Sequence, residues 1–461
     1  MNKIFIYSIL SLFALKVGAA FFTNFSLYGD EAQYWLWSQE LDFGYYSKPP
    51  LLAWFLSAHI FLFGSSFFSL KMFPLLVYFF VFFTFYRLCL ELNLSKNNSV
   101  VCSIGFLSIP AVSVSSFLIS TDLLLLLFWG LAMIFVLKIK TNGSLINFIL
   151  LGVFLGLAFL AKYAAIYFLL SFSILVLIDN GMLLTLKKNK VRFFVFVLTF
   201  LLVVFPNIYW NINNGWVTLY HTADNTNLKN LDLNFYEPLK FLISQIFMLG
   251  LVLFLSFLYM LRSFRLDFEN RYLLIFSLPI VFIVLIESFL VRANANWAAP
   301  ALISFFILMY RLVAASSNRL IVINFAANCL VGVFLFVSIL ISSNLEMFER
   351  IRGVDGFVSE VVKIVGDNDI VVTDRILFSS MSYEMRDKPN NIYMPFKKGE
   401  DITNHFQMSS PLNQAQNNNF YLIGNKSDIS YLINENEIKF LKEFDVSFSS
   451  SKLKFYEVVF K

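Results

Sequence analysis

Charged residues are scarce in this chain: they make up 14% of its 461 residues, whereas 58% are hydrophobic. A soluble globular chain carries about 25% charged residues. Apolar stretches of 18 or more residues recur between positions 4 and 341, and a membrane-spanning helix needs about 20. The composition therefore excludes an ordinary soluble enzyme and predicts a polytopic membrane protein.

Cysteines, histidines and phosphate-binding loops are also scarce. The three cysteines, Cys89, Cys102 and Cys329, all fall within apolar segments, so no disulfide framework is expected. With only three histidines, a His-rich zinc centre is not expected either. No glycine-rich phosphate loop is present, so we expect no nucleotide cofactor. The net charge of +5 is scattered over short loops, which is not the basic stripe of a nucleic-acid-binding protein.

The N-terminus resembles a signal peptide, with Lys3, an apolar run and then Gly18-Ala19-Ala20. The run over residues 4–22 is long for the apolar core of a signal peptide, which has about 7–15 residues. We therefore interpret it as the first membrane span.

The apolar segments predict eleven spans. They lie near residues 4–22, 71–90, 99–117, 121–138, 145–161, 163–179, 192–209, 239–261, 272–291, 298–315 and 320–341. The run over residues 145–178 is interrupted only by Lys162. As one helix it would be about 51 Å long, too long for a hydrocarbon core of about 30 Å. Two helices meeting at Lys162 fit better.

The distribution of basic residues predicts the orientation. Alternate loops, beginning with the N-terminus, hold more than twice as many Lys and Arg residues as the loops between them. The positive-inside rule then places the N-terminus in the cytoplasm. The long loops 23–70 and 207–238, and everything after residue 342, are expected outside. We expect a multi-pass protein of the cytoplasmic (inner) membrane with its active site on the periplasmic, extracytoplasmic side.

Two kinds of structure are expected outside the spans. Aromatic stretches at 34–37 and 51–63 in the first outer loop are typical of interfacial helices. Residues 343–461 are polar, with strand-like runs at 370–373 and 420–423. We predict a polytopic all-α membrane domain over 1–342 and a small soluble α/β domain over 343–461. No internal repeat is evident.

Adjacent carboxylates, Asp30 and Glu31, follow the first span. They could serve only the helix start, with Asp30 as an N-cap and Glu31 as a first-turn acid favoured by the helix dipole. The functional interpretation is a carboxylate at the lipid–water boundary that takes a proton from an acceptor hydroxyl. The residues alone leave both interpretations open.

Three further polar side chains are expected on the same face. Lys48 precedes two prolines, which stiffen the chain, and could bind a phosphate or simply extend to the interface. Asp122 begins a span and could be a helix cap or a ligand of a divalent cation. Lys162 adds a second cation or only marks a turn.

The chain resembles the large-fold GT-C glycosyltransferases that use polyprenyl-phosphate sugars, especially the lipid A aminoarabinose transferases and their protein-mannosyltransferase-like relatives. The matching text begins with Asp30-Glu31-Ala32-Gln33-Tyr34-Trp35-Leu36-Trp37-Ser38 and Gly44-Tyr45-Tyr46-Ser47-Lys48-Pro49-Pro50-Leu51. It continues at residues 121–122, 156–163, 206–211, 215–218 and 294–300. The matches follow one another over about the first 300 residues.

The resemblance implies roles for individual residues. The catalytic residues would be Asp30 and Glu31, with Asp30 as the base or as the residue that orients the acceptor. Asp122 would be a metal-ligand position. Lys48, Lys162 and Arg292 would bind the donor phosphate. The acceptor and donor pocket would contain Tyr34, Tyr46, Tyr163, Trp216, His221, Asn296 and Trp297.

Two departures from these relatives affect the expected ligands. The characterised relatives carry an acidic residue just before the motif lysine, and here that residue is Ser47. This leaves the need for a divalent metal open. They also place an arginine where this chain has Gln33, so anion binding would depend on Lys48, Lys162 or Arg292.

The function expected from this resemblance is inverting transfer of one sugar from a polyprenyl-phosphate donor to an outer-leaflet acceptor. Lipid A or lipopolysaccharide core is the preferred acceptor. A protein O-glycosyltransferase with the same donor class is the alternative. A transporter or flippase is more distant, because transporters usually place polar groups near the bilayer midplane and often contain repeats.

Overall fold

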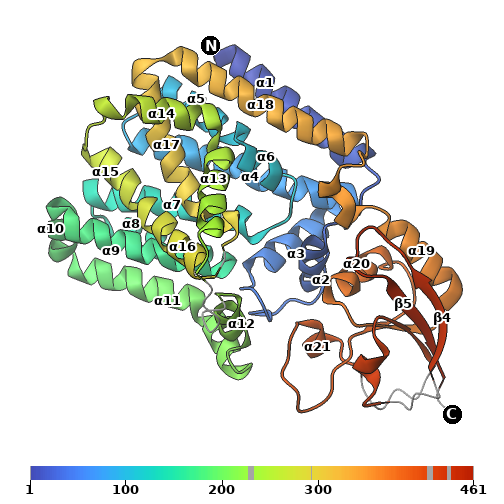
Figure 1. Ribbon diagram of the computed structural model, residues 1–461. Coiled ribbons are helices and arrows are strands. Elements are labelled where there is room, and N and C mark those ends of the chain that lie inside the picture. The colour runs from blue at the N-terminus through green and yellow to red at the C-terminus, as the bar shows by residue number, and fades with distance from the viewer. Residues whose placement is uncertain (1, 227–232, 292, 413–418, 433–437, 460–461) are drawn as a thin grey trace.

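The computed structural model describes residues 2–226, 233–291, 293–412, 419–432 and 438–459 (Figure 1). Helices α1 to α18 form one large helical body, and a smaller α/β domain follows at the C-terminal end. In this body α1 and α18, which are far apart in the sequence, lie side by side.

Within the described residues, seven helices are long and apolar enough to cross a membrane. They are α1 (Asn2–Phe22), α4 (Phe67–Glu91), α7 (Thr121–Thr141), α11 (Lys190–Asn213), α15 (Phe268–Ile275) with α16 (Leu278–Leu290), η3 (Ala295–Ala298) with α17 (Ala299–Ser316), and α18 (Asn318–Leu340). Two bent helix pairs raise the number to as many as nine. The chain is therefore a multi-span membrane protein, and the count of eleven stays a prediction.

The bent pairs and the shorter helices occupy the remaining predicted spans. One pair is η1 (Tyr163–Ala165) and α9 (Ile166–Ile178) with α10 (Asn180–Lys188), and the other is α13 (Tyr236–Leu249) with α14 (Leu251–Met260) and η2 (Leu261–Ser263). They bend by 100° and 99°. The shorter helices are α5 (Lys96–Ser108), α6 (Pro110–Ser115) and α8 (Leu145–Ala161). The chain turns between α8 and η1 at Lys162, where two helices were predicted to meet.

Two predicted spans are interrupted for identifiable reasons. Pro110 keeps Ile109 in an extended conformation, which separates α5 from α6. Gly250 has a φ of +103°, a conformation that favours glycine, and it separates α13 from α14. The Leu253 amide, freed by this break, donates a hydrogen bond to the Asn324 side chain at 3.0 Å. The backbone is thus satisfied by a residue of α18.

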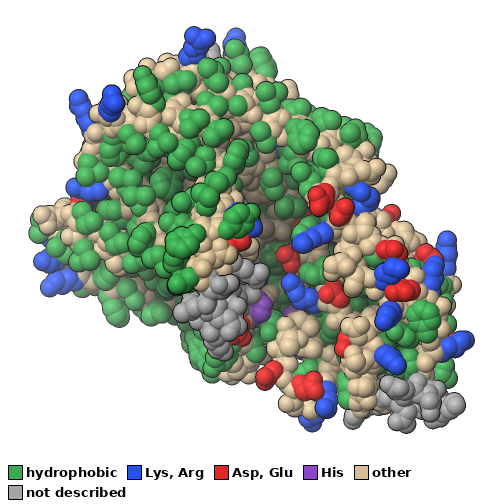
Figure 2. All heavy atoms as spheres, viewed as in Figure 1, with side chains coloured by type: hydrophobic (Ala, Val, Ile, Leu, Met, Phe, Trp, Pro, Cys, Tyr) green, Lys and Arg blue, Asp and Glu red, His purple; other side chains and the backbone are tan. Residues whose placement is uncertain are grey.

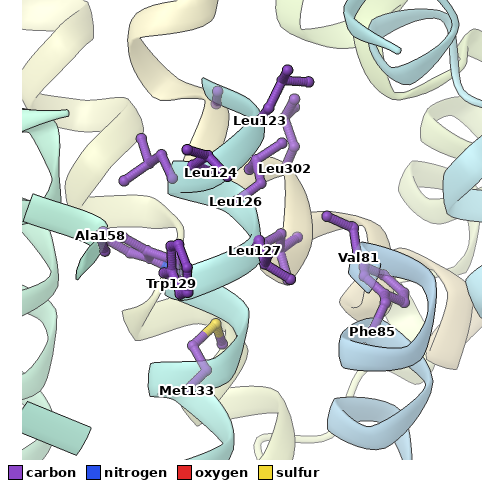
Figure 3. Close-up of a cluster of buried hydrophobic side chains, with 14 of the residues drawn as sticks. Val81, Phe85, Leu123, Leu124, Leu126, Leu127, Trp129, Met133, Ala158 and Leu302 are labelled. Carbon is purple, nitrogen blue, oxygen red and sulfur yellow. The ribbon is translucent and has the colours of Figure 1, made fainter. Parts of the chain in front are cut away.

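The centre of the helical body is α7, whose most apolar stretch is 83% buried. Leu127 lies toward Val81 and Phe85 of α4, and Trp129 lies beside Ala158 of α8 (Figure 3). An α-helix that is apolar on all sides is stable only when other helices surround it or lipid covers it. Burial of α7 fixes the position of its first turn, which carries Asp122.

Short helices cover one end of this body. α2 (Gly29–Gln39) and α3 (Leu51–Phe63) follow α1, and α12 (Val217–Thr226) follows α11. The trace from Asp42 to Lys48 between α2 and α3 lies against α11 and α12, because Asn207 and Thr218 donate hydrogen bonds to its carbonyl groups.

The C-terminal domain is a five-stranded sheet with helices. Its elements are η4 (Glu346–Ile351), α19 (Val354–Val365), β1 (Asp369–Val372), α20 (Arg375–Glu384), β2 (Ile392–Tyr393), α21 (Phe406–Ser409), β3 (Phe420–Ile423), η5 (Lys426–Ile429), β4 (Ile438–Phe444) and β5 (Leu453–Val458). The strand order is β2-β1-β3-β5-β4, with β1 parallel to β2 and β3, and β5 antiparallel to its neighbours. The two predicted strand-like runs correspond to β1 and β3. The helix α20 packs on α2 (Figure 1).

Candidate active site

A polar cavity of about 370 Å³ lies between the helical body and the C-terminal domain. Figure 2 shows this hollow, with acidic, basic and histidine side chains around it. The predicted site residues that line it are Asp30, Glu31, Tyr34, Tyr46, Lys48, Asp122, Lys162, His221, Asn296 and Trp297. They come from distant parts of the chain, and the fold brings them to one place.

The two adjacent carboxylates have different surroundings. Helix α2 begins at Gly29 with Tyr28 as its N-cap, so Asp30 is not the N-cap considered from the sequence. The Asp30 side chain is 53% exposed, and its carboxylate lies 3.8 Å from Arg375. Asp30 therefore remains accessible to a substrate in the cavity.

Glu31 is only 2% exposed and forms an ion pair with Lys71 of α4 at 2.6 Å. Its carboxylate also accepts hydrogen bonds from the amides of Tyr28 at 3.0 Å and Ile119 at 2.9 Å. These contacts tie α2 to α4 and to the segment before α7. The acceptor capacity of Glu31 is thus used for holding three elements together.

The ammonium group of Lys48 has no hydrogen-bond or ion-pair partner among the residues that the structure describes. Burial lowers the pKa of its ammonium group, and the nearby Lys162 lowers it further, whereas the carboxylates of Asp122 and Asp30 oppose this shift. An anion bound beside Lys48 would offset the positive charges of Lys48 and Lys162.

The segment before Lys48 is held on both sides. The Tyr45 amide donates to the Lys48 carbonyl at 3.1 Å, and Thr218 donates to the Tyr45 carbonyl at 2.8 Å. Gly44 is packed so closely that a Cβ atom there would lie 2.4 Å from the Trp210 ring. Together with the restriction from Pro49, these contacts fix the place where the ammonium is presented.

Asp122 uses both of its carboxylate oxygens within the protein. One accepts from the Lys162 ammonium at 2.7 Å, and the other from the Asn296 amide at 2.9 Å. The described residues contain no group of three or more His, Cys, Asp or Glu side chains arranged to hold a metal ion. A single carboxylate already bound to a cation does not fit a divalent metal well, since such metals take several oxygen ligands. A metal at Asp122 therefore stays a prediction from the sequence.

A second cavity of about 370 Å³ adjoins the first. The residues that line both are Ser47, Lys48, Lys162, Asn294 and Trp297. Away from this junction its wall is mostly apolar, with Pro49, Ala164, Ile166 and Tyr167, and it also includes Thr222 and Glu287. We name the two spaces the polar cavity and the apolar cavity. The two lysines lie where they meet.

Tyr163 lines the apolar cavity and not the polar one. Its hydroxyl donates to Asn207 at 2.8 Å and accepts from Asn211 at 3.1 Å. Trp216, at a φ of +59° in the turn before α12, is not among the described residues that line either cavity. Arg292 lies outside the described residues.

The polar cavity shifts the protonation of its aromatic side chains. Burial, together with the cations of Lys48 and Arg375, lowers the pKa of His221 to about 4. Burial also lowers the pKa of His405 to about 4. Burial raises the pKa of Tyr34, and the carboxylates of Asp30 and Asp122 add to this effect. At neutral pH both histidines are therefore uncharged and the tyrosine keeps its proton.

Sequence reasoning missed the contribution of the C-terminal domain. Arg375, Thr403, Asn404 and His405 all line the polar cavity. Arg375 is the first residue of α20, and only Thr373 and Asp374 separate it from the end of β1. Because ligands of α/β folds often bind at the carboxyl ends of parallel strands, the predicted strand at 370–373 was the available signal.

Known proteins resemble this chain in sequence and in fold. Residues 47–210 match the family described as dolichyl-phosphate-mannose-protein mannosyltransferase. The lipid A galacturonosyltransferase RgtD of Rhizobium johnstonii is 27% identical over 384 residues, which cover 79% of each chain. ArnT from Cupriavidus metallidurans has the same fold in its apo state, with a TM-score of 0.69, 12% identity and coverage of 99% of this chain and 98% of ArnT.

The undecaprenyl-phosphate-bound structure of the same ArnT gives a TM-score of 0.71 at 13% identity, covering 98% of this chain and 97% of ArnT. The fold, the polar cavity and these similarities together define a class. The chain is a multi-span membrane glycosyltransferase of the GT-C class, which confirms the class expected from its motifs.

Proposed function

We propose that this chain transfers a single sugar from a polyprenyl-phosphate donor to lipid A, with inversion at the anomeric carbon. The observation that carries the proposal is the Lys48 ammonium, which has no partner among the described residues and lies where the polar and apolar cavities meet. A polyprenyl phosphate has the same division into an anionic head and an apolar chain. An accessible ammonium beside an apolar wall matches both parts.

The donor fits across the junction of the cavities. The first isoprenoid units would lie in the apolar cavity beside Tyr163 and Ile166, with the phosphate on Lys48 and Lys162. The sugar would then extend into the polar cavity. The fold is shared with an ArnT structure that is bound to undecaprenyl phosphate, which supports a donor of this kind. Arg292 stays a proposed third contact of the phosphate.

Asp30 is the proposed general base. It takes the proton from the acceptor hydroxyl while that oxygen attacks the anomeric carbon on the side opposite the phosphate. The bond between the anomeric carbon and the phosphate oxygen breaks, and polyprenyl phosphate leaves with the electron pair, its charge compensated by Lys48 and Lys162. Attack opposite the leaving group inverts the anomeric configuration.

The neighbouring acids have supporting roles in this proposal. Glu31 positions α2 through Lys71, and Asp122 positions Lys162. The side chains proposed to surround the sugar and the acceptor are Tyr34, Tyr46, His221, Asn296 and Trp297. Trp216 would contribute indirectly, by forming the turn that positions α12 and its His221.

The site is proposed to open on the periplasmic side of the inner membrane. Eleven spans with the N-terminus in the cytoplasm would place the polar cavity and the C-terminal domain outside. The excess of Lys and Arg in the loops on the opposite side supports this orientation. A lipid-linked donor suits such a site, because it delivers an activated sugar within the membrane.

Two acceptors have support from the comparisons. RgtD is named as a lipid A transferase and matches 79% of this chain, which favours lipid A. The family description refers to protein mannosylation but matches residues 47–210 alone. Protein O-glycosylation is therefore the second candidate.

The test is transfer by purified protein from a polyprenyl-phosphate sugar to lipid A. Asp30→Asn removes the base but keeps the shape of the side chain, so transfer should fall at least about 100-fold, within the usual contribution of a general base. Asp445→Asn, an exposed change in the C-terminal domain, is the matched control and should leave transfer unchanged. Turnover at the wild-type rate in Asp30→Asn would overturn the assignment.

A further inference from the structure

The C-terminal domain forms part of the wall of the polar cavity. Arg375, from the first turn of α20, lies there together with Asn404 and His405. The Arg375 guanidinium lies 3.8 Å from the Asp30 carboxylate. Arg375 is 342 positions from Gln33 in the sequence, and the fold brings it beside Asp30, the proposed general base.

The position of Arg375 is fixed by a closely packed contact between α20 and α2. A Cβ atom on Gly29 would lie 2.2 Å from the Ile376 side chain, so only glycine leaves room for α20. Further along the contact, the rings of Trp35 and Tyr383 meet edge to face at 5.1 Å. The Tyr383 hydroxyl also donates to the Ser65 carbonyl at 3.2 Å.

A second contact holds the domain near His405. Its ring lies 5.5 Å from the Trp37 ring and 5.2 Å from the Tyr45 ring. Trp37 and Tyr45 are themselves stacked at 4.6 Å. The domain is therefore docked at two places, and its cavity-lining residues are held in a defined geometry.

The guanidinium of Arg375 has donors left for a ligand. Among the described residues, it donates one hydrogen bond, to the Gln33 side chain at 2.8 Å. Its contact with Asp30 is long for a bidentate pair, and its side chain is 47% exposed. A guanidinium carries five N–H groups and binds carboxylate and phosphate groups through two parallel hydrogen bonds.

The charges in the cavity indicate where such an anion would lie. Lys48 and Lys162 are at the junction with the apolar cavity, where the donor phosphate is proposed to bind. Arg375 is absent from the wall of that apolar cavity in the described residues and lies beside Asp30. An anion bound to Arg375 would therefore be distinct from the donor phosphate and would lie close to the reacting hydroxyl.

We propose that Arg375 binds a second anionic group of the carbohydrate substrates, a carboxylate on the transferred sugar or a phosphate on the acceptor, and so makes the C-terminal domain part of the specificity site. This inference rests on the proposed transfer to lipid A. Gln33 orients the guanidinium, and the docking of α20 on α2 sets its distance from Asp30.

The experiment compares Arg375→Gln and Arg375→Lys with wild-type protein on matched substrate pairs. One pair is a polyprenyl-phosphate hexuronate and its carboxyl-reduced hexose, and the other is lipid A and its dephosphorylated form. For the pair that carries the recognised anion, Arg375→Gln should raise KM for the anionic member about 10- to 100-fold, as expected for a lost hydrogen bond to a charged group. KM for the neutral member should change less than about threefold, within the small effect expected of a surface change. Arg375→Lys should recover part of the loss, because it keeps the charge but not the bidentate geometry.

The donor and acceptor pairs distinguish the two sources of the anion. Lys363→Gln, which removes an exposed charge of the same domain outside the cavity, should behave as wild type. Equal losses on the anionic and neutral members of both pairs, or no loss on any, would overturn the role of Arg375. Absence of transfer to lipid A by the wild-type protein would instead overturn the proposed function.

Discussion

Lys48 has an environment unlike that of an ordinary surface lysine. Burial and the neighbouring Lys162 lower its pKa, and no described side chain forms an ion pair with it. In the proposed mechanism its ammonium must be charged when the donor phosphate binds.

This environment predicts an alkaline limit to donor binding. Because the pKa of Lys48 is lowered, the ammonium loses its proton at a lower pH than an ordinary lysine. The ratio kcat/KM for the donor should therefore be highest below this pKa and fall as the pH rises through it. Lys48→Arg should move this decrease in kcat/KM to higher pH, because a guanidinium has a pKa above about 12 and stays protonated below it. An identical alkaline limb in Lys48→Arg would show that another group titrates.

Asp122 predicts how the enzyme responds to chelation. Both of its oxygens are occupied by Lys162 and Asn296, so we expect EDTA to leave the transfer rate unchanged. Asp122→Asn should slow transfer on the order of 10-fold, the effect of losing one hydrogen bond to a charged group, by releasing Lys162. Added Mg²⁺ or Mn²⁺ should not restore this variant. Loss of activity in EDTA with recovery on adding Mg²⁺ would contradict this and support the metal site.

The residues of the site differ in how far the sequence predicts them. Lys48 could be recognised from the sequence, because the two prolines that restrict its backbone are its immediate neighbours in the chain. The different environments of Asp30 and Glu31 could not be predicted, because the burial of Glu31 depends on its contacts with Lys71 of α4 and the Ile119 amide. Arg375 was missed for the same reason, since its place depends on the docking of a whole domain.

At the scale of elements, the contact between α2 and α20 decides whether the cavity is complete. Glycine at position 29 allows α20 to approach, and no other side chain fits there without movement. The break in the helix at Gly250 also depends on a distant residue, because the Leu253 amide that it frees donates a hydrogen bond to the Asn324 side chain of α18. Hydrophobic patterns predict a span over 239–261, but they contain no information about a partner from a distant helix.

Gly29→Ala should separate α20 from α2. The added methyl group overlaps the Ile376 side chain, so we expect a destabilisation of about 1–3 kcal/mol, typical of overpacking. Transfer should fall with it, because Arg375 moves from Asp30. Thermal unfolding and a transfer assay on purified protein measure the two effects.

The same contact offers a rescue and a control. Ile376→Ala removes the overlapping atoms and should restore part of the stability of Gly29→Ala. Gly356→Ala in α19 adds a methyl group where nothing lies within 4 Å, and it should be neutral. If Gly29→Ala were as stable and active as Gly356→Ala, the docking of the two helices would not be as described.

For the whole molecule, the composition predicted a multi-span membrane protein and the C-terminal run of short strands predicted a small sheet. Both follow from local patterns of apolar residues. The arrangement of the two parts around one cavity does not, because it depends on contacts such as that of His405 with Trp37 and Tyr45. Because burial lowers the pKa of that histidine, we expect the contact between the two parts to weaken in acid.

The buried histidines predict a loss of stability in acid. The pKa of both His221 and His405 is about 4 in the folded protein, against about 6.5 when unfolded. The unfolded chain therefore binds more protons than the folded one between these values, and stability should fall as the pH drops from about 6.5 to about 4. His405→Gln, which does not titrate, should show a smaller decrease in Tm across this range. The same decrease in this variant would assign the acid sensitivity to other groups.

The central claim, sugar transfer to lipid A, is tested most directly by mass spectrometry of lipid A from a strain with the gene and from a strain without it. The account predicts that loss of the gene removes the mass of one sugar from lipid A. The wild-type gene should restore this mass and the Asp30→Asn gene should not. Lipid A of unchanged mass, together with loss of a sugar from glycoproteins, would contradict the account and support protein O-glycosylation.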